Sequence, residues 1–157
     1  SRSPIYPTAS FPLQGHILAA QAIGDTYNWG RGVAIDYPRA MAAYKIAAEA
    51  GHSLSQNQVG FMYCMGRGVA VDFELARAWY EKAAAQDNAC AVGQLGGMYY
   101  EGKGVTSSYR RARELFGRAI ELGHSKSVEN MQILTRRSIA NVTSSGKPPH
   151  TTPTPFA

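Results

Sequence analysis

Cysteine, charge and long apolar runs are all scarce in this sequence, and each scarcity excludes a class of protein. Two cysteines in 157 residues are too few for a disulfide-stapled scaffold or a four-ligand zinc site. No apolar run approaches the roughly 18 residues that a membrane-spanning helix needs. Charged residues make up 17% of the chain, against roughly 25% in soluble domains, and we infer that a partner covers part of the surface.

The remaining composition is that of a folded, basic protein. Hydrophobic residues make up 45% of the chain, which excludes a wholly disordered protein. Lysine and arginine number 16 against 11 acidic residues, for a formal charge of +5. The length suits one domain, or one short array of repeats with tails.

A short glycine motif divides the chain into repeats. Gly-Arg-Gly-Val begins at Gly30 and again at Gly66, and Gly-Lys-Gly-Val begins at Gly102, so the period is 36 residues. Further glycine, tyrosine and alanine columns align at the same shift, which indicates three tandem units. The columns that we assign to repeat structure hold Gly24, Tyr27, Gly30 and Gly32; Gly60, Tyr63, Gly66 and Gly68; and Gly96, Tyr99, Gly102 and Gly104.

Each unit has the pattern of a helical hairpin. In the first unit, apolar residues at helical spacing predict a helix over residues 17–28, and the glycine motif ends it. Asp36 and Pro38 predict the start of a second helix, which Gly51 ends, and Ser53 can cap the next helix. Asp72 and Ser108 repeat the Asp36 cap, and Asp87-Asn88 replaces the terminal glycine in the second unit.

These signals predict an all-α solenoid of three hairpins plus a capping helix. The units are about 17–52, 53–88 and 89–124, with the capping helix at 125–138. Small residues in the Gly24 and Ala40 columns let each hairpin close. The Tyr27 and Tyr44 columns fill the space between units, because a lone hairpin cannot bury both faces.

Both ends of the chain differ from the repeats. Residues 1–15 carry Pro4, Pro7 and Pro12, and residues 139–157 are rich in serine, threonine and proline. Proline interrupts helices, so we expect extended Pro-rich tails outside the array at 16–138. We further expect that these tails lie along partner chains.

The repeat pattern identifies a family resemblance. A-x-x-x-[ILV]-G-x-x-Y-x-x-G-[RK]-G-V is followed by a capped turn, then by A-x-x-x-[YF]-x-x-A-A and, in two units, G-H. It resembles the Sel-one-like repeat, a branch of the tetratricopeptide-like solenoids, over about Gly15 to Leu134. The resemblance implies a right-handed α-solenoid that acts as a protein-interaction scaffold, with its first helices lining a concave face.

Carried over by register, the concave face supplies candidate partner-binding residues. They are Asp25, Asn28 and Trp29 in the first unit, Phe61 and Met65 in the second, and Tyr100 and Glu101 in the third. The register does not require large apolar groups at four of these positions, and such anchors are typical interface hot spots. The alternative is that they pack against neighbouring loops or the N-terminal tail.

Arginines gather near the end of the array. The set comprises Arg110, Arg111, Arg113, Arg118, Arg136 and Arg137. A basic patch can bind acidic protein, anionic lipid or RNA. We favour an ordinary solvated helix face over RNA or lipid contact, and we expect no DNA binding because no nucleic-acid module is visible.

No pattern in the sequence predicts catalysis, a metal or a cofactor. The glycine motifs follow helices, whereas a dinucleotide fingerprint follows a strand, and His16, His52 and His124 are spaced by whole repeats. Cys64 and Cys90 should lie roughly 15 Å apart at 1.5 Å per residue, too far for a disulfide. The chain lacks the cysteine pattern of the secreted branch of the resembled family, so its β-lactam-binding activity is a remote alternative.

We therefore predict a non-enzymatic scaffold, an accessory subunit of a larger assembly that contacts other protein subunits. The first residue is Ser1 rather than Met, so we expect either a processed chain or a segment cut from a longer one. A basic processed chain favours a mitochondrial complex slightly over a secreted, periplasmic or endoplasmic-reticulum adaptor. Asn141-Val142-Thr143 is a glycosylation sequon if the chain is secreted.

Overall fold

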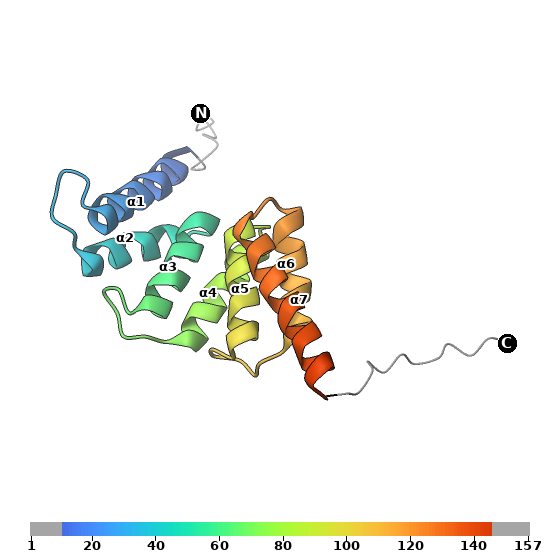
Figure 1. Ribbon diagram of the computed structural model, residues 1–157. Helices are drawn as coiled ribbons and strands as arrows, with labels where there is room; N and C mark the ends of the chain where they lie inside the picture. The colour runs from blue at the N-terminus through green and yellow to red at the C-terminus, as the bar shows by residue number, and fades with distance from the viewer. Residues whose placement is uncertain (1–10, 146–157) are drawn as a thin grey trace, which may run out of the picture.

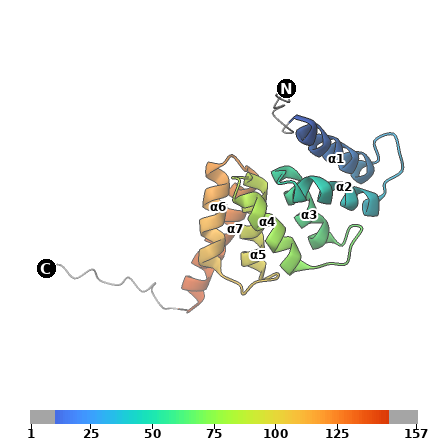
Figure 2. The same cartoon turned by 180° about the vertical axis from the view of Figure 1, so that it is seen from behind.

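The computed structural model describes residues 11–145, and all regular secondary structure in this range is helical. The helices follow one another as a curved stack from α1 to α7 (Figure 1). Seen from behind, α4 and α6 lie in front of α5 and α7 (Figure 2). The bounds are α1 Phe11–Trp29, α2 Tyr37–Glu49, α3 Ser53–Met65, α4 Phe73–Ala84, α5 Ala89–Glu101, α6 Tyr109–Glu121 and α7 Lys126–Ser145.

The stack consists of three hairpins and one closing helix. Helices α1 and α2, α3 and α4, and α5 and α6 form the hairpins, and α7 packs against α6 and α5. Each second helix also contacts the first helix of the next hairpin. The predicted all-α solenoid is therefore confirmed.

The predicted caps of the second helices are also confirmed. Asp36, Asp72 and Ser108 each adopt an extended backbone conformation and accept a hydrogen bond from the amide three residues later. The donor–acceptor distances are 3.0, 2.9 and 3.2 Å. Each bond satisfies an amide that the helix itself leaves without a partner.

The first helices are capped differently from the prediction. His52, not Ser53, caps α3, and its Nδ1 accepts from the Ser55 amide at 3.4 Å. One repeat later Asn88 caps α5, so Asn88 does not replace a helix-ending glycine. Asp87 takes that place with a φ of +57°, where Gly51 has +93°. The residue before the cap must leave the helix through left-handed backbone, and an aspartate tolerates this better than most residues.

Each hairpin closes where a glycine receives an aromatic ring. A Cβ atom on Gly24 would lie 2.5 Å from the Tyr44 ring, and one on Gly96 would lie 2.7 Å from the Phe116 ring. Tyr44 is 0% exposed and Phe116 is 2% exposed. The Tyr44 column therefore fills the hairpin interior as well as the space between units. Glycine is needed opposite each ring, because only a hydrogen atom fits there.

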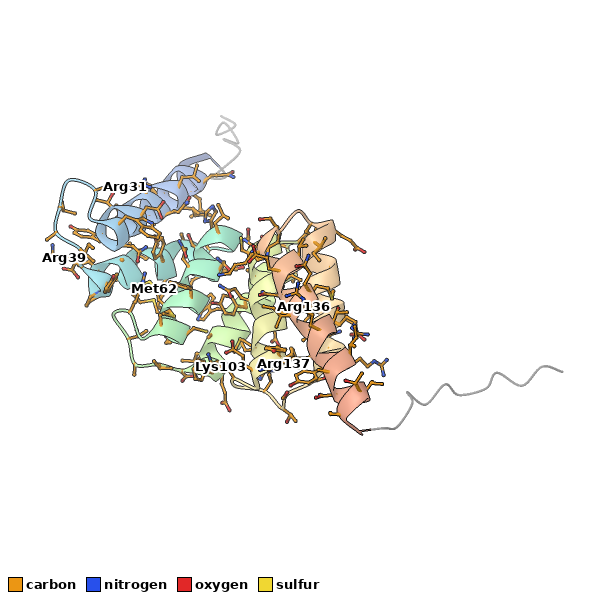
Figure 3. The ribbon with its side chains drawn as sticks, in the orientation of Figure 1. Arg31, Arg39, Met62, Lys103, Arg136 and Arg137 are labelled. Atoms are coloured by element: carbon orange, nitrogen blue, oxygen red, sulfur yellow. The ribbon has the colours of Figure 1, made fainter. Side chains whose placement is uncertain are left out.

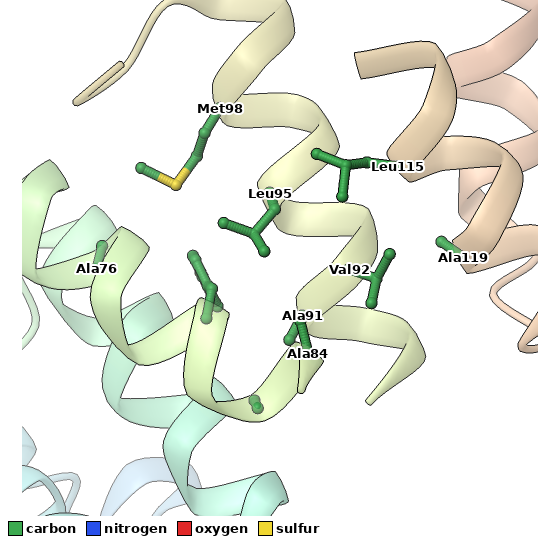
Figure 4. Close-up of a cluster of buried hydrophobic side chains, with 10 residues drawn as sticks. Ala76, Ala84, Ala91, Val92, Leu95, Met98, Leu115 and Ala119 are labelled. Carbon is green, nitrogen blue, oxygen red and sulfur yellow. The ribbon is translucent and has the colours of Figure 1, made fainter. Parts of the chain in front are cut away.

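The core is a row of small apolar clusters between successive helices. One cluster joins Ala76 of α4, Leu95 and Met98 of α5 and Leu115 of α6 (Figure 4). Another joins α2 to α3 through Tyr44 and Met62. The apolar core thus lies both within the hairpins and between neighbouring units, and the contacts between units are those expected for a solenoid.

The loop glycines tie each unit to the unit before it. Gly68 has a φ of +71°, and a Cβ there would lie 2.6 Å from the backbone of Tyr37. Gly104 is equally close to the backbone of Phe73, at 2.8 Å. In the second and third motifs, the second glycine therefore serves both the left-handed turn and a close approach of two backbones.

The helices at both ends extend beyond the prediction. Helix α1 begins at Phe11 and so includes residues 11–15, which we expected in an extended tail. Pro12 is compatible with this start because amides in the first turn of a helix have no acceptor within the helix, so the missing amide of proline costs no hydrogen bond. Helix α7 continues past 138 to Ser145, because no proline occurs before Pro148. The expectations for residues 1–10 and 146–157 lie outside the described residues.

Candidate partner-binding groove

Two neighbouring pockets lie beside α5. The first pocket, of about 180 Å³, is between α3 and α5. Its lining includes the apolar side chains of Phe61, Met65, Phe73 and Met98, with Glu101 and Lys103 at the same pocket. An apolar lining with a few charged groups is typical of a surface that receives a side chain of another molecule.

The second pocket, of about 210 Å³, is between α5 and α7. Tyr100, Phe116 and Ile133 supply its apolar lining, and Asn130 supplies an amide. Both pockets are lined by Gly97 and Glu101. We call the two pockets together the Gly97 groove.

Gly97 keeps the groove open along its middle. Nothing lies within 4 Å of the position that a Cβ atom would occupy on this residue. The neighbouring Gly96, by contrast, faces the Phe116 ring inside the hairpin. The absence of a side chain at Gly97 therefore leaves space at the surface rather than in the core.

Cations lie over the aromatic walls of the groove. The Arg67 guanidinium is 5.2 Å from the centre of the Phe61 ring, and the Lys103 ammonium is 5.7 Å from the Phe73 ring. On the other side of α5, Arg137 lies 5.6 Å from the Tyr100 ring. Figure 3 shows Lys103 and Arg137 near the lower end of α5. These contacts hold positive charge beside the apolar pockets.

One acidic residue offsets part of this charge. Glu101 forms an ion pair with Lys103, and its hydrogen bond raises the pKa of Lys103. Both side chains are about half exposed, so the pair adds little to stability. It fixes the position of the Lys103 ammonium at the first pocket.

Cys64 and Tyr80, which also line the first pocket, are uncharged at neutral pH. Burial raises the pKa of the Cys64 thiol, and burial also raises the pKa of the Tyr80 hydroxyl. The reactive form of cysteine is the thiolate, so this environment disfavours nucleophilic chemistry.

The structure gathers four of the seven predicted partner-binding residues. Phe61 and Met65 line the first pocket, Tyr100 lines the second, and Glu101 lines both. Trp29 is 56% exposed at the end of α1 and does not line either pocket. The two pockets therefore gather predicted residues of α3 and α5, but none of α1.

Two predicted residues of the first unit have structural contacts instead. The Asp25 carboxylate accepts a hydrogen bond of 2.6 Å from the Tyr44 hydroxyl, which links the two helices of the first hairpin. Asn28 is only 6% exposed, so the prediction that it offers a side chain to a partner is wrong. The register of the resembled family did not distinguish this burial from exposure.

The sequence reasoning missed Phe73 and Lys103 as parts of the groove. Both belong to repeat columns, since Phe73 is equivalent to Tyr37 and Lys103 to Arg67. In each case the cation of the glycine loop lies over the ring that begins the second helix of the preceding unit. The sequence did carry a signal for this contact. In two successive repeats, an aromatic residue is followed 30 residues later by an arginine or lysine.

The predicted arginine patch divides into separate contacts. Arg110 and Arg111 both bind Glu114, which lowers the pKa of that carboxyl group. Arg118 binds the Asp87 carboxylate at 2.6 Å and the Ala84 carbonyl at 3.2 Å, so it ties α6 to the preceding unit.

The other three arginines lie along or beside α7. Arg113 donates to Ser138 at 3.5 Å, Arg137 lies over the Tyr100 ring, and Arg136 is exposed. Figure 3 shows Arg136 and Arg137 together on α7. Arg137 thus places positive charge beside Tyr100, which lines the second pocket.

Residues 11–145 offer no obvious place for a metal ion. Within this range no cluster of three histidine, cysteine or acidic side chains is found. Cys64 and Cys90 are both free thiols. No helix in the described part of the chain is long and apolar enough to cross a bilayer.

Comparison with protein families identifies the repeat. The family model of the Sel1 repeat matches residues 17–52, 53–88 and 91–124, more than half of the chain. The chain belongs to the Sel1 repeat family. This is the Sel-one-like resemblance drawn from the glycine, tyrosine and alanine columns, and it is confirmed.

Solved structures with the same fold come from several bacteria. A protective antigen of uropathogenic Escherichia coli with an SLR fold is 36% identical, with a TM-score of 0.75 over 80% of this chain and 27% of its own. A Sel1 repeat protein from Oxalobacter formigenes is 29% identical, with a TM-score of 0.71 over 80% of this chain and 50% of its own. This chain thus spans at most half the length of these two relatives.

A third structure supports the fold alone. Cysteine rich protein B of Helicobacter pylori is 22% identical, with a TM-score of 0.61 over 78% of this chain and 97% of its own. A search of curated proteins finds no match to this chain. Sel1 repeat proteins are scaffolds for protein–protein interaction and are generally non-enzymatic adaptors.

Proposed function

We propose that this Sel1 repeat protein is a non-enzymatic scaffold that binds an extended segment of a partner protein in the Gly97 groove. The observation that carries the proposal is the pair of apolar pockets on the two sides of Gly97. Pockets for small molecules usually have volumes of roughly 300–1,000 Å³. Two smaller pockets of about 180 and 210 Å³ suit two apolar side chains of a peptide.

The charges around the groove favour an acidic partner segment. Arg67, Lys103 and Arg137 are cations near the pockets, and Glu101 is the one acidic residue that lines them. Complementary charge speeds the encounter and favours the correct register. The expected ligand therefore has two large apolar residues with acidic residues beside them.

The proposal can be tested by filling the groove. In Gly97→Leu the new side chain occupies the open space between the pockets. The substitution should not weaken α5, because leucine is a better helix former than glycine. A random peptide library selected on the wild-type protein should give segments with two apolar residues and acidic flanks. These peptides should bind Gly97→Leu at least tenfold more weakly.

Gly117→Leu is the matched control. Gly117 lies on α6, outside both pockets, and a Cβ there would make only one ordinary contact, at 3.9 Å from Met131. Peptides should bind this variant as they bind the wild type. Peptides whose affinity is the same for Gly97→Leu and the wild type would refute the groove as the binding site.

The proposed role in a cell is that of an accessory subunit within a larger assembly. The low charged fraction and the open groove support this role. A mitochondrial location remains a prediction from the basic composition, beside the secreted or periplasmic adaptor. The neutral Cys64 and Tyr80 in the first pocket support binding over the remote β-lactam hydrolase alternative.

A further inference from the structure

The positive charge of this chain is concentrated after α5. Residues 102–145 contain eight lysines and arginines against three acidic residues, whereas residues 11–101 contain six against eight. Helices α6 and α7, with the loop before α6, therefore carry the excess of cations. Since the Gly97 groove runs from α3 across α5 to α7, a bound segment meets a different charge at its two ends.

The cations at the first pocket already have partners. Lys103 forms an ion pair with the Glu101 carboxylate, so each neutralises the other. Arg67 is half-buried, and its guanidinium lies 5.2 Å from the ring of Tyr37 and 5.2 Å from the ring of Phe61. An acidic side chain at this pocket would have to compete with Glu101 for Lys103.

The cation at the second pocket has a ring but no carboxylate. Arg137 is exposed, and its guanidinium lies 5.6 Å from the centre of the Tyr100 ring. No ion pair within residues 11–145 involves Arg137. A guanidinium stacked on a ring still presents its planar fork of N–H donors. Arg137 can therefore donate two parallel hydrogen bonds to a carboxylate.

Helix α7 places Arg137 at the rim of the second pocket. Asn130 and Ile133 line this pocket, and Arg137 follows Ile133 by four residues, so the three residues share one face of the helix. Tyr100, the ring under the Arg137 guanidinium, lines the same pocket. Arg137 thus lies beside any side chain that this pocket receives.

The ring under Arg137 is held in place by a second ring. Tyr100 stacks on Tyr109, with ring centres 5.4 Å apart and 29° between the ring planes. Tyr100 is near the end of α5, and Tyr109 begins α6, so the stack joins the two helices of the third hairpin. A cation on a fixed ring is positioned before a ligand arrives, which lowers the entropy cost of binding.

A second arginine reaches the same turn of α7. Arg113 of α6 donates a hydrogen bond of 3.5 Å to the Ser138 hydroxyl, and Ser138 directly follows Arg137. In the described part of the chain Arg113 also takes part in no ion pair. Arginines from two helices therefore offer uncompensated charge at this end of the groove.

We propose that Arg137, assisted by Arg113, binds the carboxylate of an aspartate or glutamate next to the residue held in the second pocket. The partner segment is apolar at the first pocket and acidic beyond the second. This inference rests on the proposed peptide-binding function and adds the place of the acid. Residues 1–10 and 146–157 contain no aspartate or glutamate, so neither segment supplies the carboxylate.

The test uses a peptide that is selected on the wild-type chain and that Gly97→Leu binds more weakly. Each acidic residue of the peptide is replaced in turn by its amide, and fluorescence anisotropy measures the affinity. One replacement should weaken binding about tenfold, because a charge-assisted hydrogen bond is lost. The other replacements should have smaller effects, because they remove only screened charge.

Two neighbouring arginines of α7 provide matched variants. Arg137→Gln should weaken binding of the acidic peptide about tenfold. Arg136→Gln removes the same charge from an exposed residue that is turned about 100° around the helix, and it should change binding by about twofold at most. In Arg137→Gln the decisive amide replacement should cause no further loss, because the two groups act on each other. Circular dichroism should show unchanged helical content in both variants.

Three results would overturn the inference while the groove itself stands. The first is equal binding to Arg137→Gln and Arg136→Gln by a peptide that Gly97→Leu weakens. The second is additive losses from Arg137→Gln and every amide replacement. The third is binding of single-stranded RNA at about 0.15 M salt that Arg137→Gln abolishes, since that would assign the cation to a nucleic acid. If Gly97→Leu weakens no selected peptide, the proposed function fails, and this inference fails with it.

Discussion

Adding one methyl group to each of two adjacent glycines should change stability in opposite directions. Gly96 and Gly97 are both inside α5, where replacing glycine by alanine ordinarily stabilises a helix by roughly 0.5–1 kcal/mol. A Cβ atom on Gly96 would lie 2.7 Å from two atoms of the Phe116 ring. On Gly97 it would meet nothing within 4 Å.

The magnitudes follow from this difference. Gly97→Ala should raise the free energy of unfolding by about 0.5–1 kcal/mol. In Gly96→Ala the Phe116 ring, which is 2% exposed, has no free space to move into, and overpacking costs about 1–3 kcal/mol. After the helix-propensity gain, Gly96→Ala should be destabilising by up to about 2 kcal/mol.

Urea denaturation followed by circular dichroism measures both values. A double-mutant cycle with Phe116→Ala provides the control, because Gly96→Ala should no longer be harmful once the ring is gone. Gly97→Ala should give the same gain with or without Phe116. If Gly96→Ala stabilises the chain as much as Gly97→Ala does, the explanation of hairpin closure is wrong.

Two further predictions concern the Asp72 cap and His124, whose Nδ1 lies 2.7 Å from the Ser127 hydroxyl. Asp72→Ala should lower the free energy of unfolding by about 1 kcal/mol in urea denaturation. Asp72→Asn retains a side-chain oxygen acceptor, so it should lower the free energy of unfolding by less. Equal losses in the two variants would contradict the capping role of Asp72. Burial holds the pKa of His124 below its usual value, so the unfolded chain binds the proton more readily than the folded one. Stability should therefore fall as the pH drops below about 6.5. The variant His124→Asn places at 124 the residue type that Asn88 has one repeat earlier. It should reduce the loss of stability between about pH 7.5 and about pH 5.5, measured by thermal denaturation. An unchanged pH dependence would contradict the role of His124.

The hairpins could be predicted from the sequence because their signals are local. Asp36 caps a helix through the amide of a residue three positions later. A glycine ends a helix because its own backbone adopts a positive φ. The 36-residue period then repeats these signals in register. The cap at His52 was missed because histidine is an uncommon cap, although its column with Asn88 was visible.

The binding surface was predicted only in part. The register identified Phe61 and Tyr100 as outward residues, and both line the Gly97 groove. It also placed Asn28 outward, although this residue is 6% exposed. Register gives the direction of a side chain from its helix, but the exposure depends on which helices lie beside it.

Ile23 and Val59 illustrate this division. They occupy the same repeat column with similar side chains, so the sequence by itself determines that both lie on the same face of a first helix. Ile23 is 49% exposed and Val59 is 0% exposed. Only the tertiary structure decided this, because α3 has a preceding second helix to cover it and, within the described residues, α1 does not.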